Sequence, residues 1–495
     1  MEDGQAADTG VEDAYGTRIH CEHRKGALAS DFVGRARVFV AVVVAALACA
    51  GGASAKSAAT GWTEVTIYAS DATPLACAYI IPSGTPPAGG WPGVILFHGL
   101  GQSHADMEPF GSALAQFDFA ALACDARGSG ASGGKFGLDG TRDVQDAQDL
   151  FTWFAGRADV SHTQIGALGL SLGGGEVWNA AVAGVPFKAI VPAVAWTNLG
   201  GALNPNGVPK AGEIAELAQA VPSSRWDPSL AQAMQGLLGG TVSAAVKSTE
   251  AARSPRPALH SLHVPTFILQ GRHDFLFDMD QAIAAYKLLA GPKRLYLGDL
   301  GHAPAQNPTA EQTDYLPEVL GWFREYLAGG SAVGGGVELA HDPWDGRTSS
   351  YKSLPQTRHV SVNLPGKTSL KAPEASVSRS VRVTGGPLET FGDGSVTVRY
   401  SGAASGWTHV IATVAVKGKS TPVTFGAARV AKTSGVLHIP LSDQAVLLRR
   451  GKRLVVTVGG ETAGGVYLSA SGGSGSITIG RITLDMSLLK RAVSK

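Results

Sequence analysis

The pattern of apolar and polar positions changes along this chain and divides it into parts. Two strand-like runs, residues 63–68 and 75–81, flank a polar turn and predict a hairpin. The runs that follow are apolar throughout, as parallel strands covered on both faces require. These buried strands are predicted at residues 92–97, 119–123, 165–169, 189–194, 266–269 and 294–297.

Helical patterns lie between these predicted strands. In residues 140–154 the apolar side chains fall three and four positions apart, which is the spacing of one helix face. Further helices are predicted at residues 174–183 and 315–327. Strands that alternate with helices in this way predict an α/β fold with a mostly parallel, doubly wound sheet.

The alternation stops between residues 198 and 262. This stretch contains helical patterns at residues 213–219 and 230–238, together with proline turns. An insertion at this point would lie above the carboxyl ends of the strands, where ligands bind in such sheets. We therefore expect residues 198–262 to form a helical cap.

The composition and the pattern of apolar positions change again after residue 328. Residues 329–336 have the composition of a flexible linker. Residues 337–490 contain runs of period two that are separated by glycine turns, with no helical pattern of any length. We expect an α/β domain over residues 62–328 and an all-β, jelly-roll-like sandwich over residues 337–490.

An apolar run near the amino terminus has the features of a secretory signal. Residues 38–50 follow Arg35 and Arg37 and lead into a stretch of small residues. We expect residues 1–55 to be a signal peptide with an upstream extension, and the mature protein to be secreted or to reside in the periplasm or cell envelope. About 13 apolar residues fall short of the ~20 that span a bilayer, so a permanent anchor is the less favoured alternative. Lipoprotein attachment at Cys49 also stays open.

The charge balance limits the classes of partner. The chain has 41 lysines and arginines against 40 aspartates and glutamates, which gives a net charge of +1. No basic cluster offsets this balance locally. Nucleic acid and anionic membrane surfaces are therefore not expected as partners.

Cysteine usage is informative only together with export. Removal of residues 1–55 would leave Cys77 and Cys124, which lie on segments expected to pair in the sheet. An exported protein meets an oxidising compartment, where a disulfide would persist. A disulfide and two free, buried thiols are both compatible with the sequence.

Two sequences of the form G-x-S-x-G occur, at residues 169–173 and 130–134. In a chain with 65 glycines, about one such match is expected by chance, so context has to separate them. Ser171 directly follows a predicted strand and precedes a predicted helix, which forces a sharp turn that exposes the hydroxyl. Ser132 lies in a run too rich in glycine to open a helix. We therefore predict Ser171 as a nucleophile.

Two later strand ends carry the partners that a serine nucleophile needs. A serine hydroxyl is barely nucleophilic at neutral pH and requires a base that is itself oriented by an acid. Asp274 follows the strand at residues 266–269, and His302 follows the strand at residues 294–297. The order along the chain predicts Ser171, Asp274 and His302 as nucleophile, orienting acid and general base.

Alternatives to this acid and base lie close by in the chain. Asp278 and Asp280 are the substitutes if Asp274 only caps a helix. His273 directly precedes the predicted acid and cannot hold the same geometry as His302. We therefore expect His273 to be structural.

The transition state of acyl transfer also needs hydrogen-bond donors for its oxyanion. They are usually the backbone N–H of the residue after the nucleophile and one N–H from the loop after the third strand. In this chain those residues are Leu172 and Leu100. His98, at the start of the same loop, is expected to hold the loop in shape.

Residues 125–134 also contain a G-x-G-x-x-G pattern after a predicted strand. A dinucleotide site needs a helix that begins at this pattern, and residues 135–138 do not open one. We expect instead that Asp125 and Arg127 form an internal ion pair that braces the turn. No spacing of cysteine and histidine suggests a metal site, and no cofactor is expected.

Taken together, these features resemble a known group of enzymes. They are the predicted cap, the trailing β-sandwich, the turn at Ser171 and the motif Asp125-x-Arg127-Gly128-x-Gly130-x-Ser132-Gly133-Gly134. Over roughly residues 62–490 the chain is similar to the X-prolyl dipeptidyl peptidase and cocaine-esterase group of serine hydrolases. The resemblance implies an α/β-hydrolase fold with a helical cap and a C-terminal jelly roll that helps to close the pocket. It also implies a triad at Ser171, Asp274 and His302.

The chain departs from this group at two places. Leu172 stands where the group usually has an aromatic residue, and residues 98–102 lack the tyrosine that often serves the oxyanion hole. This loop looks more like that of dienelactone-hydrolase-type and related esterases. The departures weigh against dipeptidase specificity and leave serine hydrolysis intact.

The sequence thus predicts an exported serine hydrolase that cleaves carboxylic esters through an acyl-enzyme intermediate. Its expected partner is a small-molecule ester or a short peptide. An X-Pro dipeptidyl-peptidase-like activity is the alternative, for which Glu213 and Glu216 are acidic cap residues that could meet a free amine. A distant alternative is a non-catalytic cell-surface protein that binds through its β-sandwich.

Overall fold

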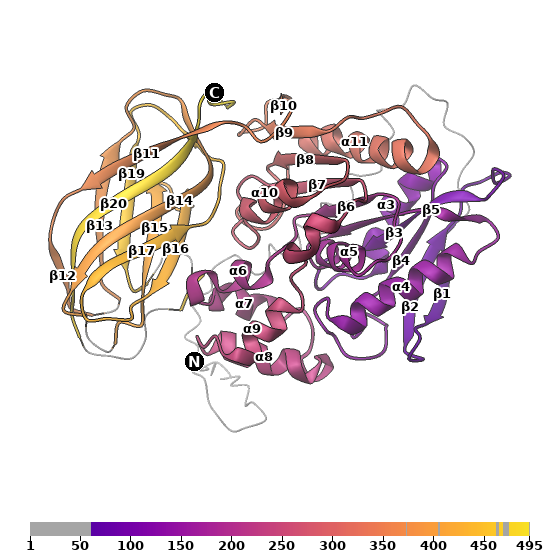
Figure 1. Ribbon diagram of the computed structural model, residues 1–495, viewed down its shortest axis with the longest axis horizontal. Coiled ribbons are helices and arrows are strands. Elements are labelled where there is room, and N and C mark those ends of the chain that lie inside the picture. Colours follow the sequence, from indigo (N-terminus) through magenta and orange to yellow (C-terminus); the bar gives the residue numbers. More distant parts are fainter. Residues whose placement is uncertain (1–60, 373, 404–405, 462–464, 469–474, 495) are drawn as a thin grey trace, which may run out of the picture.

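A computed structural model describes residues 61–372, 374–403, 406–461, 465–468 and 475–494. The predicted signal peptide and Cys49 lie outside the described residues. No helix within the described part of the chain is long and apolar enough to cross a membrane. The described residues form a mixed α/β part, a helical cap and a C-terminal β-sandwich (Figure 1).

A ten-stranded sheet runs through the first part, in the order β1-β2-β4-β3-β5-β6-β7-β8-β9-β10. The strands from β3 to β9 are parallel, and the edge strands β1, β2 and β10 pair in antiparallel fashion. Their bounds are β1 (Thr63–Tyr68), β2 (Pro74–Ile80), β3 (Trp91–Phe97), β4 (Ala120–Cys124), β5 (Val160–Leu170), β6 (Ile190–Ala193), β7 (Thr266–Gly271), β8 (Lys293–Gly298), β9 (Gly336–Ala340) and β10 (Thr348–Tyr351).

Helices cover both faces of this sheet, which explains why its central strands are apolar at every position. One core cluster packs α4 (Thr141–Ala155), α5 (Leu172–Val182) and α10 (Met279–Leu288) on one face. A second cluster packs α3 (His104–Gln116) and α11 (Thr309–Ala328) on the other face. The predicted doubly wound α/β fold is confirmed.

The cap is the segment between β6 and β7. Its helices are α6 (Leu199–Leu203), α7 (Ala211–Leu217), α8 (Pro228–Leu238) and α9 (Ala244–Ala251), with the 3₁₀ turns η1 (Pro205–Gly207), η2 (Ser223–Arg225) and η3 (Arg256–Ser261). These helices share an apolar cluster with Leu172, directly after the predicted nucleophile, and with Phe277, after the predicted acid. The cap therefore packs on the carboxyl ends of the strands.

The C-terminal part consists of two antiparallel sheets that enclose one apolar core. The first has the order β11-β20-β14-β17, with β12 and β18 at its margins, and the second has the order β13-β19-β15-β16. The bounds are β11 (Thr357–Leu364), β12 (Thr368–Leu370), β13 (Ser376–Arg382), β14 (Leu388–Ser401), β15 (His409–Val416), β16 (Thr424–Arg429), β17 (Gly435–Leu441), β18 (Leu447–Leu448), β19 (Arg453–Gly459) and β20 (Ile477–Leu489).

The boundary between the two parts differs from the sequence-based expectation. The prediction assigns everything after residue 336 to the sandwich, whereas β9 and β10 extend the ten-stranded sheet and the sandwich begins with β11. β9 pairs in parallel with β8, and its residues Val337 and Leu339 are buried in the first core cluster. A short apolar strand has the same sequence pattern in the ten-stranded sheet and in the β-sandwich. Only the strand with which it pairs shows to which of the two it belongs.

A disulfide joins Cys77 and Cys124, which face each other across the paired strands β2 and β4. The sequence left two free thiols as the alternative. The bond ties the N-terminal hairpin to the strand that precedes the Asp125 turn.

We expect replacement of both cysteines by alanine to lower the free energy of unfolding by about 2–4 kcal/mol, because a crosslink over this span restricts the unfolded chain. Urea denaturation of the wild type and the Cys77→Ala/Cys124→Ala variant measures this loss. Dithiothreitol should reduce the stability of the wild type by a similar amount and leave the variant unchanged. Equal stability of both proteins without reductant would contradict the prediction.

Candidate active site

Ser171 lies at a sharp turn between β5 and α5. Its backbone has a φ of 54° and a ψ of −111°, a conformation that L-residues adopt only where the surroundings impose it. A Cβ on Gly169 would lie 2.0 Å from the Gly173 carbonyl oxygen, and one on Gly173 would lie 2.1 Å from that of Phe97. Both glycines of the motif are therefore required by close backbone approach.

Three side chains from different strand ends meet at this turn. The Ser171 hydroxyl lies 2.9 Å from Nε2 of His302, and Nδ1 of His302 lies 2.8 Å from Oδ2 of Asp274. The structure thus brings together all three residues that the sequence proposes as a triad. When Nδ1–H donates to Asp274, the Nε2 lone pair faces the hydroxyl, as a general base requires.

The carboxylate of Asp274 is fully buried and held by four hydrogen bonds. The backbone N–H groups of Leu276 and Phe277 donate to Oδ1, and the backbone and ring N–H groups of His302 donate to Oδ2. A Cβ on Gly301 would lie 2.5 Å from Oδ2, so a glycine is needed directly before the histidine. This arrangement fixes the carboxylate toward the imidazole.

The other candidates for acid and base point elsewhere. Asp278 accepts a hydrogen bond from the backbone N–H of Asp443, and Asp280 forms a 2.7 Å ion pair with Arg256. The ring of His273 contacts the Pro422 carbonyl at 3.1 Å. Burial lowers the pKa of His273 to about 4, which keeps it neutral, as expected of a structural histidine.

The predicted oxyanion donors lie on two neighbouring segments. Leu172 is the first residue of α5, so its backbone N–H has no acceptor within the helix. Leu100 packs against the same apolar cluster that contains Leu172. These two N–H groups stay candidates for the oxyanion hole.

The loop that carries Leu100 is fixed by polar contacts. Nε2 of the buried His98 accepts a hydrogen bond from the Ala126 N–H, so Nδ1–H donates to the Gly99 carbonyl at 2.7 Å. Burial lowers the pKa of His98, which favours this neutral form. Gln102 accepts a hydrogen bond from the Gly99 N–H at 2.8 Å. These contacts agree with a structural role for His98.

The two acidic residues of the cap differ in position. Oε2 of Glu213 is buried and has no hydrogen-bond partner among the described residues. Burial raises the pKa of Glu213 to about 7, and the charges of Lys210, Asp274 and His302 also act on it. Glu216 is exposed. Of the two, Glu213 is therefore the one that lies near Asp274 and His302.

The predicted ion pair between Asp125 and Arg127 is wrong. Asp125 accepts hydrogen bonds from the backbone and ring of His104, at 2.7 and 2.8 Å. Arg127 pairs instead with Asp71 from the β1–β2 turn and with Asp146 from α4. The two side chains bind partners on different elements, which residue spacing within one turn cannot indicate.

The second G-x-S-x-G match has a structural explanation. The hydroxyl of the buried Ser132 donates to the Asp125 carbonyl at 2.7 Å and accepts from the Ala76 N–H at 2.9 Å. The Gly128 N–H donates to the Gly133 carbonyl, which closes the glycine-rich segment on itself. No helix begins here, as a dinucleotide site would require.

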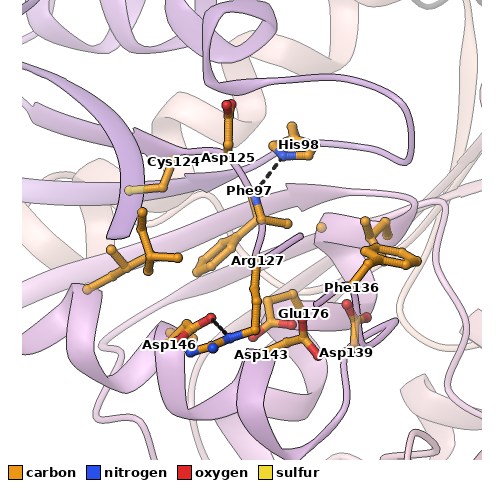
Figure 2. A pocket seen from close by; sticks show the side chains of 16 residues that line it. Phe97, His98, Cys124, Asp125, Arg127, Phe136, Asp139, Asp143, Asp146 and Glu176 are labelled. Atoms are coloured by element: carbon orange, nitrogen blue, oxygen red, sulfur yellow. Dashed lines mark hydrogen bonds and ion pairs between the residues drawn. The ribbon is translucent and has the colours of Figure 1, made fainter. Parts of the chain in front are cut away.

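A cluster of buried acids, which sequence reasoning missed, lies beneath the turn at Ser171. Figure 2 shows Asp139, Asp143 and Glu176 side by side in a pocket that also contains the pair of Arg127 and Asp146. Burial raises the pKa of Asp139 and of Glu176 well above their usual ranges, and the charges of neighbouring acids add to both shifts. Burial also raises the pKa of Asp143 to about 7. These three acids therefore keep their protons to a higher pH than exposed carboxyl groups do.

One group of described residues has the composition of a metal site. Glu64, His104 and Glu108 each bring one potential ligand atom within 4.8 Å of the others. However, the His104 ring already contacts Asp125 at 2.8 Å and Glu64 at 3.3 Å. These ion pairs account for the positions of His104 and Glu64 without a metal.

Comparisons with known proteins agree with this architecture. Residues 71–304, just under half of the chain, match the family model of the X-Pro dipeptidyl-peptidase (S15 family). No curated protein matches the chain. The resemblance to the X-prolyl dipeptidyl peptidase and cocaine-esterase group that the sequence indicates is confirmed.

Several solved structures share the fold over nearly their whole length. A CocE/NonD family hydrolase from Staphylococcus aureus aligns with a TM-score of 0.68 over 89% of this chain and 99% of its own, at 13% identity. An aminopeptidase from a marine sediment Thaumarchaeota archaeon gives 0.67 over 88% and 97%, at 12% identity. An α-amino acid ester hydrolase gives 0.66 over 89% and 97%, also at 12% identity. At these identities the likeness shows the α/β-hydrolase fold with its C-terminal β-rich part, and not the substrate.

The acid cluster predicts how the stability depends on pH. Because the pKa values of Asp139, Asp143 and Glu176 are raised in the folded state, the folded protein keeps protons that the unfolded chain loses near pH 4. These acids therefore lower the free energy of unfolding as the pH rises from about 5 to about 8. The Glu176→Gln variant removes one titrating proton and should flatten this fall by up to about 1.4 kcal/mol per pH unit.

Urea denaturation over this pH range, with exposed Glu216→Gln as a control, measures the difference. The control should follow the wild type at every pH. A Glu176→Gln variant whose stability runs parallel to that of the wild type would show that Glu176 is ionised in the folded protein.

Proposed function

We propose that this chain, which resembles the X-prolyl dipeptidyl peptidase and cocaine-esterase group, is an exported serine hydrolase that cleaves carboxylic esters through an acyl-enzyme. The observation that carries this proposal is the unbroken hydrogen-bond chain from Asp274 through His302 to Ser171. It ends on a serine whose hydroxyl is presented by a turn with positive φ.

The reaction follows from the positions of these atoms. Nε2 of His302 takes the proton of the Ser171 hydroxyl as the oxygen attacks the ester carbonyl, and the oxyanion accepts hydrogen bonds from the N–H groups of Leu172 and Leu100. Asp274 stabilises the imidazolium. His302 then gives the proton to the departing alcohol, and a water molecule hydrolyses the acyl-enzyme by the same steps.

An ester substrate is favoured by the donors available to the oxyanion. The loop of residues 98–102 contains no tyrosine, so the donors that we propose are backbone N–H groups. The residues around the serine, Leu172, Phe277 and Leu100, join the apolar cluster of the cap, which suits an uncharged acyl group. The related folds include both hydrolases and an aminopeptidase, so the fold does not decide between them.

One observation favours a peptide substrate as the second candidate. The carboxyl group of Glu213 is buried near the catalytic pair and has an oxygen without a partner among the described residues. An ionised Glu213 would offer a counter-charge to the free amine of a peptide or amino acid ester. Its raised pKa of about 7 makes such binding stronger as the pH rises through that value.

Export is supported by two independent features. The apolar run at residues 38–50 has the pattern of a secretory signal. The disulfide between Cys77 and Cys124 is of a kind that persists in oxidising compartments and is rare in the cytosol.

Labelling with a fluorophosphonate probe tests the nucleophile. The wild type should be labelled, and Ser171→Ala should lose labelling together with at least a 10⁴-fold drop in ester turnover, roughly the loss seen when a triad member is removed. Ser132→Ala, the other G-x-S-x-G serine, is the control and should keep its label when folded. An unlabelled wild type, or a labelled Ser171→Ala variant, would refute the serine mechanism and favour a binding protein.

A pair of substrates separates the two candidate activities. A short-chain aryl ester should be turned over with a higher kcat/KM than an Ala-Pro anilide. Glu213→Gln should leave the ester reaction unchanged, since no substrate charge faces this residue. Preferential turnover of the anilide by the wild type, with an increase of about tenfold or more in its KM for Glu213→Gln, would reverse the ranking.

A further inference from the structure

Residues of the C-terminal β-sandwich contact the segment that carries Asp274 at several points along its length. The backbone of Arg272 accepts a hydrogen bond from the Ala445 N–H at 2.7 Å. The Arg272 Nε–H donates to the Ala445 carbonyl at 2.8 Å. Ala445 thus forms hydrogen bonds with both the backbone and the side chain of Arg272, which lies two positions before Asp274.

Arg272 is also half of a buried ion pair between the two parts of the molecule. Its guanidinium, 1% exposed, pairs with the carboxylate of Glu389 in β14, which is 0% exposed. Burial by itself would raise the pKa of Glu389, but the charge and hydrogen bond of Arg272 hold it below its usual value. The N–H groups of Val493 and Ser494 donate to the second carboxylate oxygen, at 2.7 and 3.1 Å. The pair therefore stays charged, and both oxygens of the Glu389 carboxylate accept hydrogen bonds.

A second contact reaches the catalytic acid itself. The side-chain amide of the buried Gln444 donates to the backbone carbonyl of Asp274 at 3.0 Å. The backbone of Gln444 is held in turn by Thr390, whose hydroxyl donates to the Gln444 backbone carbonyl at 3.0 Å and accepts from the Val446 N–H at 2.8 Å. The sandwich thus bonds to the main chain of Asp274 through a residue whose own backbone carbonyl is held by Thr390.

The contacts continue on the far side of Asp274. The rings of Phe275 and Phe425 meet edge to face with centroids 4.7 Å apart. The Met279 N–H donates to the Asp443 carbonyl, and the Asp443 N–H donates to the Asp278 carboxylate, both at 3.1 Å. The loop is therefore held by the sandwich both before and after the acid.

We infer that Glu389 and Gln444 of the β-sandwich are positioning residues for Asp274, so that the sandwich is a working part of the active site. This inference rests on the proposed triad. The acid must stay within hydrogen-bond distance of the His302 ring, and a displacement of about 1 Å can cost on the order of 10²-fold in rate. Neither residue touches the substrate, and both act only through the loop.

Two variants and one matched control test this role. Gln444→Leu removes the donor to the Asp274 carbonyl, and Glu389→Gln removes the charge that holds Arg272. Thr424→Val is the control, because the buried Thr424 hydroxyl donates to the Ser442 carbonyl at 2.7 Å and makes a contact of the same kind without touching the loop. All three are made in the full chain and checked for folding by thermal melting.

We expect Gln444→Leu and Glu389→Gln to lower kcat and the rate of fluorophosphonate labelling by about 10- to 100-fold, with KM changed less than about twofold. The acid limb of the kcat/KM profile should shift to lower pH, because a displaced Asp274 no longer favours the imidazolium. Thr424→Val should lower Tm but keep the wild-type kcat and pH profile.

The outcomes are distinguishable from a failure of the proposed function. A labelled, active wild type together with Gln444→Leu and Glu389→Gln variants that behave like Thr424→Val would overturn the positioning role alone. A wild type that is not labelled would overturn both. If Glu389→Gln does not fold, the pH profile of Gln444→Leu decides.

Discussion

The carboxylate of Asp274 has no exposure to solvent, and the geometry of the candidate site depends on how its charge is accommodated. A buried charge is tolerated only when hydrogen bonds replace its hydration. The donors come from two loops, the one after β7 and the one after β8, so these strands must end at the same level. Their register pairs Gly271 with Gly298, which brings Asp274 and His302 to one edge of the sheet. The absence of a side chain at Gly301 then lets the two groups meet.

Buried acids elsewhere in the molecule are accommodated by other means. Glu389 stays ionised because Arg272 neutralises it, whereas burial raises the pKa of Asp139 and of Glu176 well above their usual ranges. The first arrangement links the two parts of the molecule. The second lies under the turn that presents Ser171. In each case the charge state of the buried carboxyl group follows from which other groups lie next to it.

The loop after β7 is the junction of all three structural parts. Lys210 from the cap donates to the Phe275 and Leu276 carbonyls at 2.6 and 3.2 Å, and Gln444 from the sandwich donates to the carbonyl of Asp274. The strand itself belongs to the ten-stranded sheet. The cap and the sandwich therefore both bond to the same short segment, the one that carries Asp274.

The sequence by itself determined the order of strands and helices, the turn at Ser171 and the choice of His302 as the candidate base. These features follow from the period of the apolar positions, the spacing of glycines and the order of residues along the chain, which are local properties. It ranked Asp274 above Asp278 and Asp280 from strand position, and the structure brings Asp274 alone of the three to the imidazole. Only the tertiary structure decided the partners of Asp125 and Arg127, the assignment of β9 and β10 to the first sheet and the pair of Arg272 with Glu389. These contacts join residues far apart in the chain, and the spacing of residues within one segment carries no information about which distant segment will face it.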